Sequence, residues 1–110
     1  MIFKKVSMCI FIAQIIAAQA AIAGTSVGTK ITSIVAQDNR TWIYFSPDIG
    51  NATTCTDKSS VEVSNDMTNR DLIMSLAMSA MISGKSVVWL TSDTCSNVDK
   101  AVIRGIRVYD

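Results

Sequence analysis

The spacing of apolar residues is helical in the middle of the chain and strand-like on either side of it. Between Thr68 and Gly84, apolar residues recur three and four positions apart, which predicts an amphipathic helix with Thr68 as its N-cap and Gly84 as its left-handed end. Its core face is expected to consist of Leu72, Ile73, Leu76, Ala77 and Ala80. The following segment, Val87-Val88-Trp89-Leu90, predicts a strand with Trp89 in the core.

β-Branched residues and two-residue alternation predict further strands before and after the helix. The expected strands span residues 30–36, 41–45, 60–64, 85–91 and 101–109. Asp38-Asn39 suits a tight hairpin turn between the first two strands. Gly105 predicts a bulge in the last strand, which would direct Ile103 and Ile106 inward and Arg104 and Arg107 outward.

Three strands, a helix and two strands follow one another in the order of the OB-fold. We therefore expect a mostly β fold: a five-stranded OB-fold-like Greek-key barrel with one helix between strands 3 and 4. The pattern shows no internal repeat and no second domain, so residues 24–110 are expected to form a single domain.

Residues 1–23 have the features of a cleaved signal peptide. Lys4 and Lys5 precede an apolar run over residues 6–18, and Ala21-Ile22-Ala23 is a small-x-small cleavage sequence. The run is too short for a spanning helix, so no membrane span is expected after signal cleavage. The mature protein is expected to be secreted or periplasmic, in a bacterial setting.

The composition of residues 24–110 excludes several classes of function. Eight basic and nine acidic residues remain after cleavage, so the net charge is 8 − 9 = −1, and nucleic acid is not an expected partner. Histidine is absent, which removes Ser-His and Cys-His nucleophiles and nearly all zinc-hydrolase sites. There is also no Gly-rich phosphate loop. We therefore expect no enzymatic activity, no cofactor and no metal.

Cys55 and Cys95 are the two cysteines that remain after cleavage. In an oxidising compartment an isolated pair is most simply a disulfide, which would stabilise the fold by roughly 4 kcal/mol in the chain-entropy description. A redox pair and a metal site are the alternatives. The wide spacing disfavours the first and the absence of histidine disfavours the second.

The stretch from Ser75 to Leu90 carries a family resemblance. A helix runs through Ser83-Gly84-Lys85 directly into Val87-Val88-Trp89. Together with the order of elements, this resembles the B subunits of A–B-type bacterial toxins, in the subtilase-cytotoxin and pertussis-like branch. The resemblance implies a ring pentamer that binds cell-surface glycans and accompanies a toxin A chain. That branch has aromatic residues near the end of this helix, where this chain has Ala80-Met81-Ile82, so its sugar pocket cannot be transferred.

The candidate ligand-binding residues lie at and after the first predicted hairpin. They are Asp38, Asn39, Arg40, Trp42 and Tyr44. Flat aromatic faces beside amide and carboxylate groups suit a carbohydrate, and this region of an OB-fold binds oligosaccharides. The alternative is that Trp42 and Tyr44 pack between subunits or beneath the loop at residues 47–59.

Met74, Met78 and Met81 form a second apolar stripe on the predicted helix. A helix that is apolar nearly all round is expected to be buried on more than one side, which favours self-association through these methionines. The alternative is a half-buried helix with scattered exposed methionines. The sequence thus predicts an exported glycan-binding oligomer, and a monomeric periplasmic protein that binds or inhibits a protein partner is the competing hypothesis.

Overall fold

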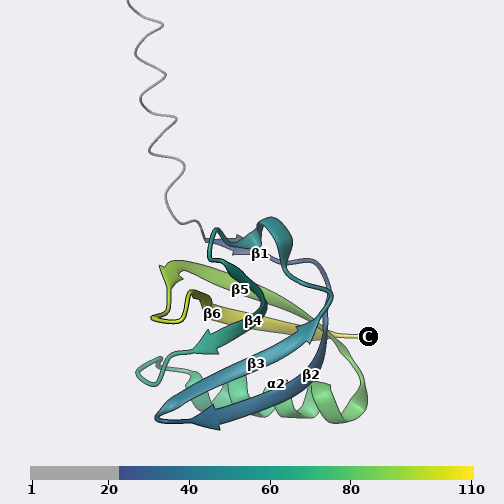
Figure 1. Cartoon of the computed structure of the whole chain (residues 1–110). Helices are drawn as coiled ribbons and strands as arrows, with labels where there is room; N and C mark the ends of the chain where they lie inside the picture. The colour runs from purple at the N-terminus through teal and green to yellow at the C-terminus, as the bar shows by residue number, and fades with distance from the viewer. Residues whose placement is uncertain (1–22) are drawn as a thin grey trace, which may run out of the picture.

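The structure is a computed structural model that describes residues 23–110, so residues 1–22 of the predicted signal peptide lie outside the described residues. The elements are β1 (Gly24–Thr25), β2 (Lys30–Gln37), β3 (Arg40–Ser46), the 3-10 turn η1 (Gly50–Ala52), β4 (Asp57–Val63), α2 (Arg70–Ser83), β5 (Ser86–Cys95) and β6 (Lys100–Tyr109). The fold is mostly β with one helix, as predicted (Figure 1). No helix among the described residues is long and apolar enough to cross a membrane.

The strands form one mixed sheet in the order β1-β5-β6-β4-β3-β2. Only the β4–β6 pair is parallel among these strands, and all other neighbours are antiparallel. Residues 23–110 contain six strands instead of the expected five, because Gly24–Thr25 adds a short strand along β5. The sheet also remains open: Thr29 pairs with Val87 in an isolated bridge, and no continuous ladder joins β2 to β5.

The β2–β3 hairpin forms where the sequence predicts it. Asp38 and Asn39 have φ angles of 51° and 64°, the left-handed pair that a tight two-residue turn requires. Along β3 the side chains alternate as expected, so that Ile43 and Phe45 are buried and Trp42 is half-buried on the opposite face. The hairpin therefore presents Trp42 and Tyr44 together on the outer face of the sheet.

The predicted irregularity in β6 is confirmed. The register with β5 passes from Leu90–Gly105 to Thr91–Ile103, so Arg104 is an extra residue on the β6 side. Ile103 is consequently buried, whereas the side chains of Arg104 and Arg107 are exposed. A continuous alternation would have placed Arg104 on the inner face instead.

α2 begins at Arg70, and its N-cap is Asn69 without a side-chain capping bond. The predicted N-cap, Thr68, is therefore wrong by one position, and the first turn is held instead by the Arg70 amide donating to the Met67 carbonyl at 3.2 Å. The other end is as predicted: Gly84 has a φ of +70° and its amide donates to the Ala80 carbonyl.

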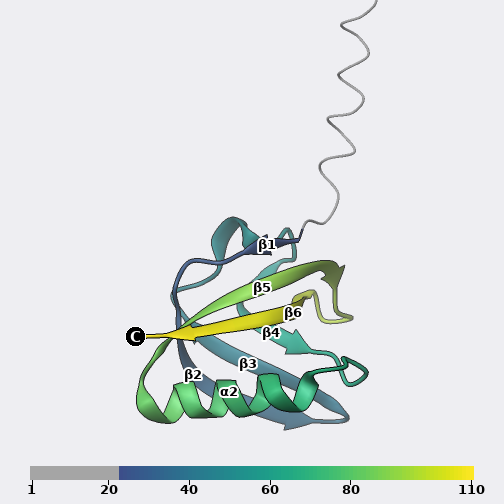
Figure 2. The ribbon, with the colours of Figure 1, turned by 180° about the vertical axis from the view of Figure 1, so that it is seen from behind.

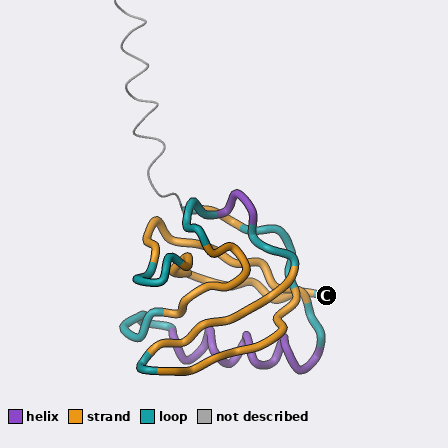
Figure 3. The backbone as a smooth tube through the Cα atoms, viewed as in Figure 1, coloured by secondary structure: helices purple, strands orange, loops and turns teal. Residues whose placement is uncertain are grey.

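α2 packs against β2, β5 and β6 at one end of the strand layer. Figure 2 shows the helix running across this end, and Figure 3 shows η1 at the opposite end, beside β1. The sheet contacts a narrower stripe of the helix than predicted, consisting of Ile73, Ala77 and Ala80.

Leu72 and Leu76 were expected in the core and are exposed, with 60% and 37% of their surface accessible. Met74 and Met81 take their place, partly buried against the core cluster. The buried stripe therefore lies further round the helix than the predicted face. Ala77 and Ala80 are small enough to pack directly against the sheet, and the two flexible methionines cover the core along one side of this stripe.

The core is centred on Trp89, which is fully buried as predicted. Its ring lies 5.3 Å from that of Phe45, centroid to centroid, and its indole N–H donates to Thr29 Oγ1 at 2.9 Å. The Ser26 hydroxyl accepts the Trp89 backbone N–H at 2.9 Å. The segment after β1 thus covers the tryptophan and supplies the polar partner that a buried indole needs.

Candidate functional site

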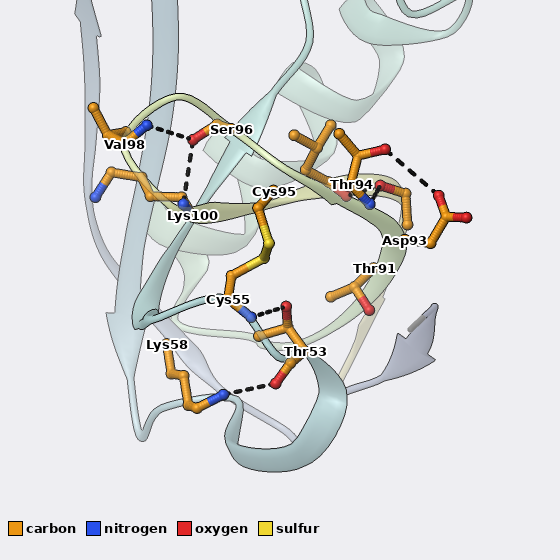
Figure 4. Close-up of a disulfide and its surroundings, with 12 residues drawn as sticks. Thr53, Cys55, Lys58, Thr91, Asp93, Thr94, Cys95, Ser96, Val98 and Lys100 are labelled. Carbon is orange, nitrogen blue, oxygen red and sulfur yellow. Dashed lines mark hydrogen bonds between the residues drawn. A yellow bond between two sulfur atoms is a disulfide. The ribbon is translucent and has the colours of Figure 1, made fainter. Parts of the chain in front are cut away.

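The predicted disulfide between Cys55 and Cys95 is present, with 5.7 Å between the two Cα atoms (Figure 4). It joins the segment before β4 to the end of β5, across 40 positions of sequence. The Cys55 amide donates to Thr53 Oγ1 at 3.0 Å, which orders the chain on that side of the bridge. Asp99 lies near both sulfur atoms, but the sulfurs are bonded to each other and are not available as thiolate ligands for a metal.

A buried lysine organises the outer face of the sheet. Lys100, at the start of β6, is only 6% exposed, and its Nζ donates to Asp57 Oδ2 at 2.6 Å and to Ser60 Oγ at 2.8 Å. The same ammonium lies 5.3 Å from the centroid of the Trp42 ring and 4.9 Å from that of Tyr44. The cation is therefore held by a carboxylate, a hydroxyl and two aromatic faces.

The ion pair shifts the pKa of both partners. Burial by itself raises the pKa of Asp57, but the hydrogen bonds from Lys100 and Ser59 outweigh it and lower the pKa to about 2. Burial likewise disfavours the charged form of Lys100, but the Asp57 carboxylate and the Tyr44 hydroxyl raise its pKa above the ordinary value. Both groups are charged across the physiological pH range, so their ion pair links β4 to β6 throughout that range.

The predicted ligand residues are divided between this cluster and a cleft. Trp42 and Tyr44 face Lys100, and the Trp42 indole N–H donates to Glu62 Oε1 at 2.8 Å. Asp38, Asn39 and Arg40 lie at the hairpin tip and line a cleft beside the start of α2. Of the five predicted ligand residues, the three polar ones therefore line the cleft together, whereas the two aromatic ones contact Lys100.

This cleft, the helix cleft, has a volume of about 700 Å³, within the usual range of small-ligand sites. Its lining consists of Ala36, Gln37, Asp38, Asn39, Arg40, Thr41, Asn65, Met67, Thr68, Arg70 and Asp71. Most of these side chains are polar, and amide, carboxylate and guanidinium groups occur together. Such planar groups can donate or accept two hydrogen bonds each.

Arg70 has the most distinctive environment in the helix cleft. Its Nη2 atom donates to Thr41 Oγ1 at 2.6 Å, while its Nε atom is buried without a hydrogen-bond partner among the residues that the structure describes. Within residues 23–110 neither Arg70 nor Arg40 forms an ion pair. The helix cleft therefore contains two guanidinium groups with hydrogen-bonding capacity to spare.

A second cleft adjoins it on the other side of the hairpin tip. This loop cleft has a volume of about 470 Å³ and lies between the hairpin, β4 and the chain around the disulfide. It is lined by Asn39, Arg40, Glu62, Ser64, Asn65, Asp66, Thr94, Cys95, Ser96 and Asn97. The Ser96 hydroxyl accepts the backbone N–H groups of Val98 and Lys100, so this wall of the cleft is ordered by its own hydrogen bonds (Figure 4).

Sequence reasoning missed Arg70, Asp71 and Asn65 as neighbours of the hairpin. These residues lie more than twenty positions from Asn39 in sequence, and the pattern around them indicates a helix start rather than a site. It also missed the Lys100–Asp57–Ser60 cluster. A lysine at the end of a loop, just before a predicted strand, is ordinarily solvated, and nothing nearby in the sequence identifies its partners.

Comparisons with protein-family models, with characterised proteins and with solved structures find no match to this chain.

Proposed function

We propose that this chain is an exported, non-enzymatic protein that binds a glycan at the helix cleft. The observation that carries the proposal is the composition of that cleft. Asp38, Asn39, Arg70 and Asp71 surround one hollow with carboxylate, amide and guanidinium groups, and no histidine occurs in the sequence to support most hydrolytic chemistry. Paired hydrogen bonds to planar polar groups are well suited to the hydroxyl groups of a sugar.

The proposal includes an OB-fold-like architecture. The strand order, the parallel β4–β6 pair and the Thr29–Val87 bridge support it, because together they bring the first long strand back beside β5. The position of α2 between β4 and β5 in the chain supports it as well. β1 would then be an addition at the N-terminal end of the fold.

Export is supported by the disulfide, because such bonds persist in oxidising compartments. The predicted signal peptide at residues 1–23 completes this part of the proposal. N-terminal sequencing of the protein recovered from a bacterial periplasm or culture medium tests it. A mature chain that begins at Gly24 is expected, and an intact chain retaining Met1 in the cytoplasm would contradict export.

Self-association is supported by the outward side of α2. Leu72, Leu76, Met78 and Ile82 are exposed there, the last at 83%. Met78 belongs to the predicted methionine interface, while Met74 and Met81 lie partly against the protein's own core. We propose that this exposed surface of α2 contacts further copies of the chain, in a ring of the kind that the toxin B-subunit resemblance implies, with a toxin A chain as its partner.

The ligand test is a glycan array probed with the oxidised protein and with Asn39→Gly. Glycine tolerates the φ of 64° at this position, so the variant removes the amide without straining the turn. Glycan binding by the wild type that falls at least tenfold in Asn39→Gly is expected. Asn51→Ala, which removes an exposed amide on η1 at the far end of the strand layer, is the matched control and is expected to bind normally.

The assembly test is the solution mass by light scattering. An oligomer that dissociates in Met78→Glu and in Ile82→Ser is expected, since both side chains are exposed and neither change disturbs the core. A monomeric wild type would contradict self-association. A blank glycan array together with a monomer would leave the alternative, in which the exposed apolar side chains of α2 bind a different protein.

A further inference from the structure

The helix cleft and the loop cleft share three residues, Asn39, Arg40 and Asn65. Asn65 Nδ2 donates to the Asn39 carbonyl, so the loop before α2 is joined to the hairpin tip at this point. We call these three shared residues the ridge, because they lie where the two hollows meet. A ligand that binds in one cleft and continues past Asn39 and Asn65 would enter the other.

The loop cleft contains the same kinds of polar groups as the helix cleft, and most of them come from different residues. Glu62 is held in place by the Trp42 indole N–H, and the Asp66 carboxylate accepts from the Ser64 hydroxyl. Thr94 and Asn97 are exposed on the opposite wall. Side chains positioned in advance by their neighbours lose little further conformational entropy when a ligand binds, which is a property of a preorganised site.

The charges around the two clefts argue against an acidic ligand. The two arginines, Arg40 and Arg70, face the four carboxylates of Asp38, Glu62, Asp66 and Asp71. An anionic sugar would encounter more negative than positive groups, and its desolvated charge would be poorly compensated. A neutral ligand with many hydroxyl groups can instead donate to the carboxylates and accept from the guanidinium and amide groups.

We infer that the two clefts form one elongated site for a neutral oligosaccharide, with successive sugar units on either side of the Asn39–Asn65 ridge. This inference rests on the proposed glycan-binding function and specifies the class and the minimum length of the ligand. Trp42 is a positioning residue in this site: it orients Glu62 and does not itself line either cleft.

The test uses the full oxidised protein, an array of neutral and acidic glycans, and then calorimetric titration with the monosaccharide, disaccharide and trisaccharide fragments of the best neutral binder. We expect neutral glycans to bind best and affinity to rise at least tenfold from one unit to two. Thr94→Ala combined with Asn97→Ala should reduce binding of the disaccharide and trisaccharide and leave the monosaccharide unchanged. Asp71→Ala should reduce binding of all three.

Asn51→Ala is the control, and thermal unfolding shows whether each variant is folded; Thr94 and Asn97 are exposed, so their replacement should not alter stability. A preference for acidic glycans, or equal affinity for all fragment lengths with no effect of the Thr94 and Asn97 changes, overturns the inference while the proposed function stands. Binding to none of the glycans on the array overturns the proposed function and the inference with it.

Discussion

Lys100 and Asp57 are paired across the parallel junction of β4 and β6, with 2.6 Å between Nζ and Oδ2. The junction is otherwise irregular, because the register shifts between Asp57 and Val61. The ion pair therefore fixes two strands at a place where backbone hydrogen bonds are interrupted. It also holds the face of the sheet on which Trp42 donates to Glu62, a residue that lines the loop cleft.

The first prediction concerns acid stability. The pKa of Asp57 is about 2 in the folded protein and near 3.8 when unfolded, so the unfolded chain takes up the proton more readily. The stability that Asp57 contributes is complete above about pH 4 and is lost as the pH falls toward 2; it amounts to about 1–2 kcal/mol. Urea denaturation at several pH values between 2 and 5 measures it. Asp57→Asn should flatten this part of the pH profile, and an unchanged profile would show that other carboxylates cause it.

The second prediction compares a buried and an exposed ion pair. Lys100→Met should destabilise the fold by roughly 2–4 kcal/mol, because it leaves the Asp57 carboxylate and the Ser60 hydroxyl without their cation. Lys85→Met removes the ion pair with Asp110, whose side chain is 89% exposed, and should leave the stability almost unchanged because solvent screens this pair. Urea denaturation of both variants at pH 7 provides the measurement. If both variants lost the same amount of stability, the buried position of Lys100 would not strengthen its ion pair with Asp57.

The third prediction concerns the disulfide. Replacing Cys55 and Cys95 together by serine should lower the free energy of unfolding by roughly 3–5 kcal/mol, since the bridge closes a loop of 40 residues in the unfolded chain. Thermal unfolding followed by circular dichroism measures this loss. Reduction of the wild type with dithiothreitol should give a comparable decrease, and the reductant should leave the double variant unaffected.

The fourth prediction concerns the end of α2. Gly84 has a φ of +70°, and a Cβ atom there would meet nothing within 4 Å. Gly84→Ala should therefore cost about 1 kcal/mol through backbone strain alone. Asparagine tolerates the left-handed conformation better than alanine, so Gly84→Asn should be less destabilising. If neither variant lowered the midpoint of thermal unfolding, the left-handed conformation assigned to Gly84 would be incorrect.

Local patterns in the sequence predicted much of the fold. The Asp38-Asn39 turn, the left-handed Gly84 and the β6 irregularity near Gly105 each depend on the conformational preferences of one or two residues. The disulfide was predicted because Cys55 and Cys95 are the two cysteines expected to remain after signal cleavage. The glycan ligand, self-association and export remain predictions.

The local sequence pattern was insufficient to predict which side of α2 packs against the sheet. The apolar residues of α2 surround most of the circumference, so periodicity could not decide whether Leu72 and Leu76 or Met74 and Met81 would face the sheet. The packing of α2 against β2, β5 and β6 decided it, with Ala77 and Ala80 buried at the contact. The short strand β1 likewise could not be predicted from the sequence, because its two residues acquire strand geometry only by pairing with β5.

What the sequence by itself determined is the approximate position of the five longer strands, the helix and the turns, because these depend on preferences between near neighbours. Apart from the Cys55–Cys95 disulfide, the tertiary structure alone decided which distant residues meet. It brought Lys100 to Asp57 across 43 positions and Arg70 to Thr41 across 29, and it placed Asn65 against Asn39 to form the ridge between the two clefts. Such contacts arise from the packing of whole elements, and the pattern of apolar residues along the chain does not specify which polar side chains from distant elements will pair.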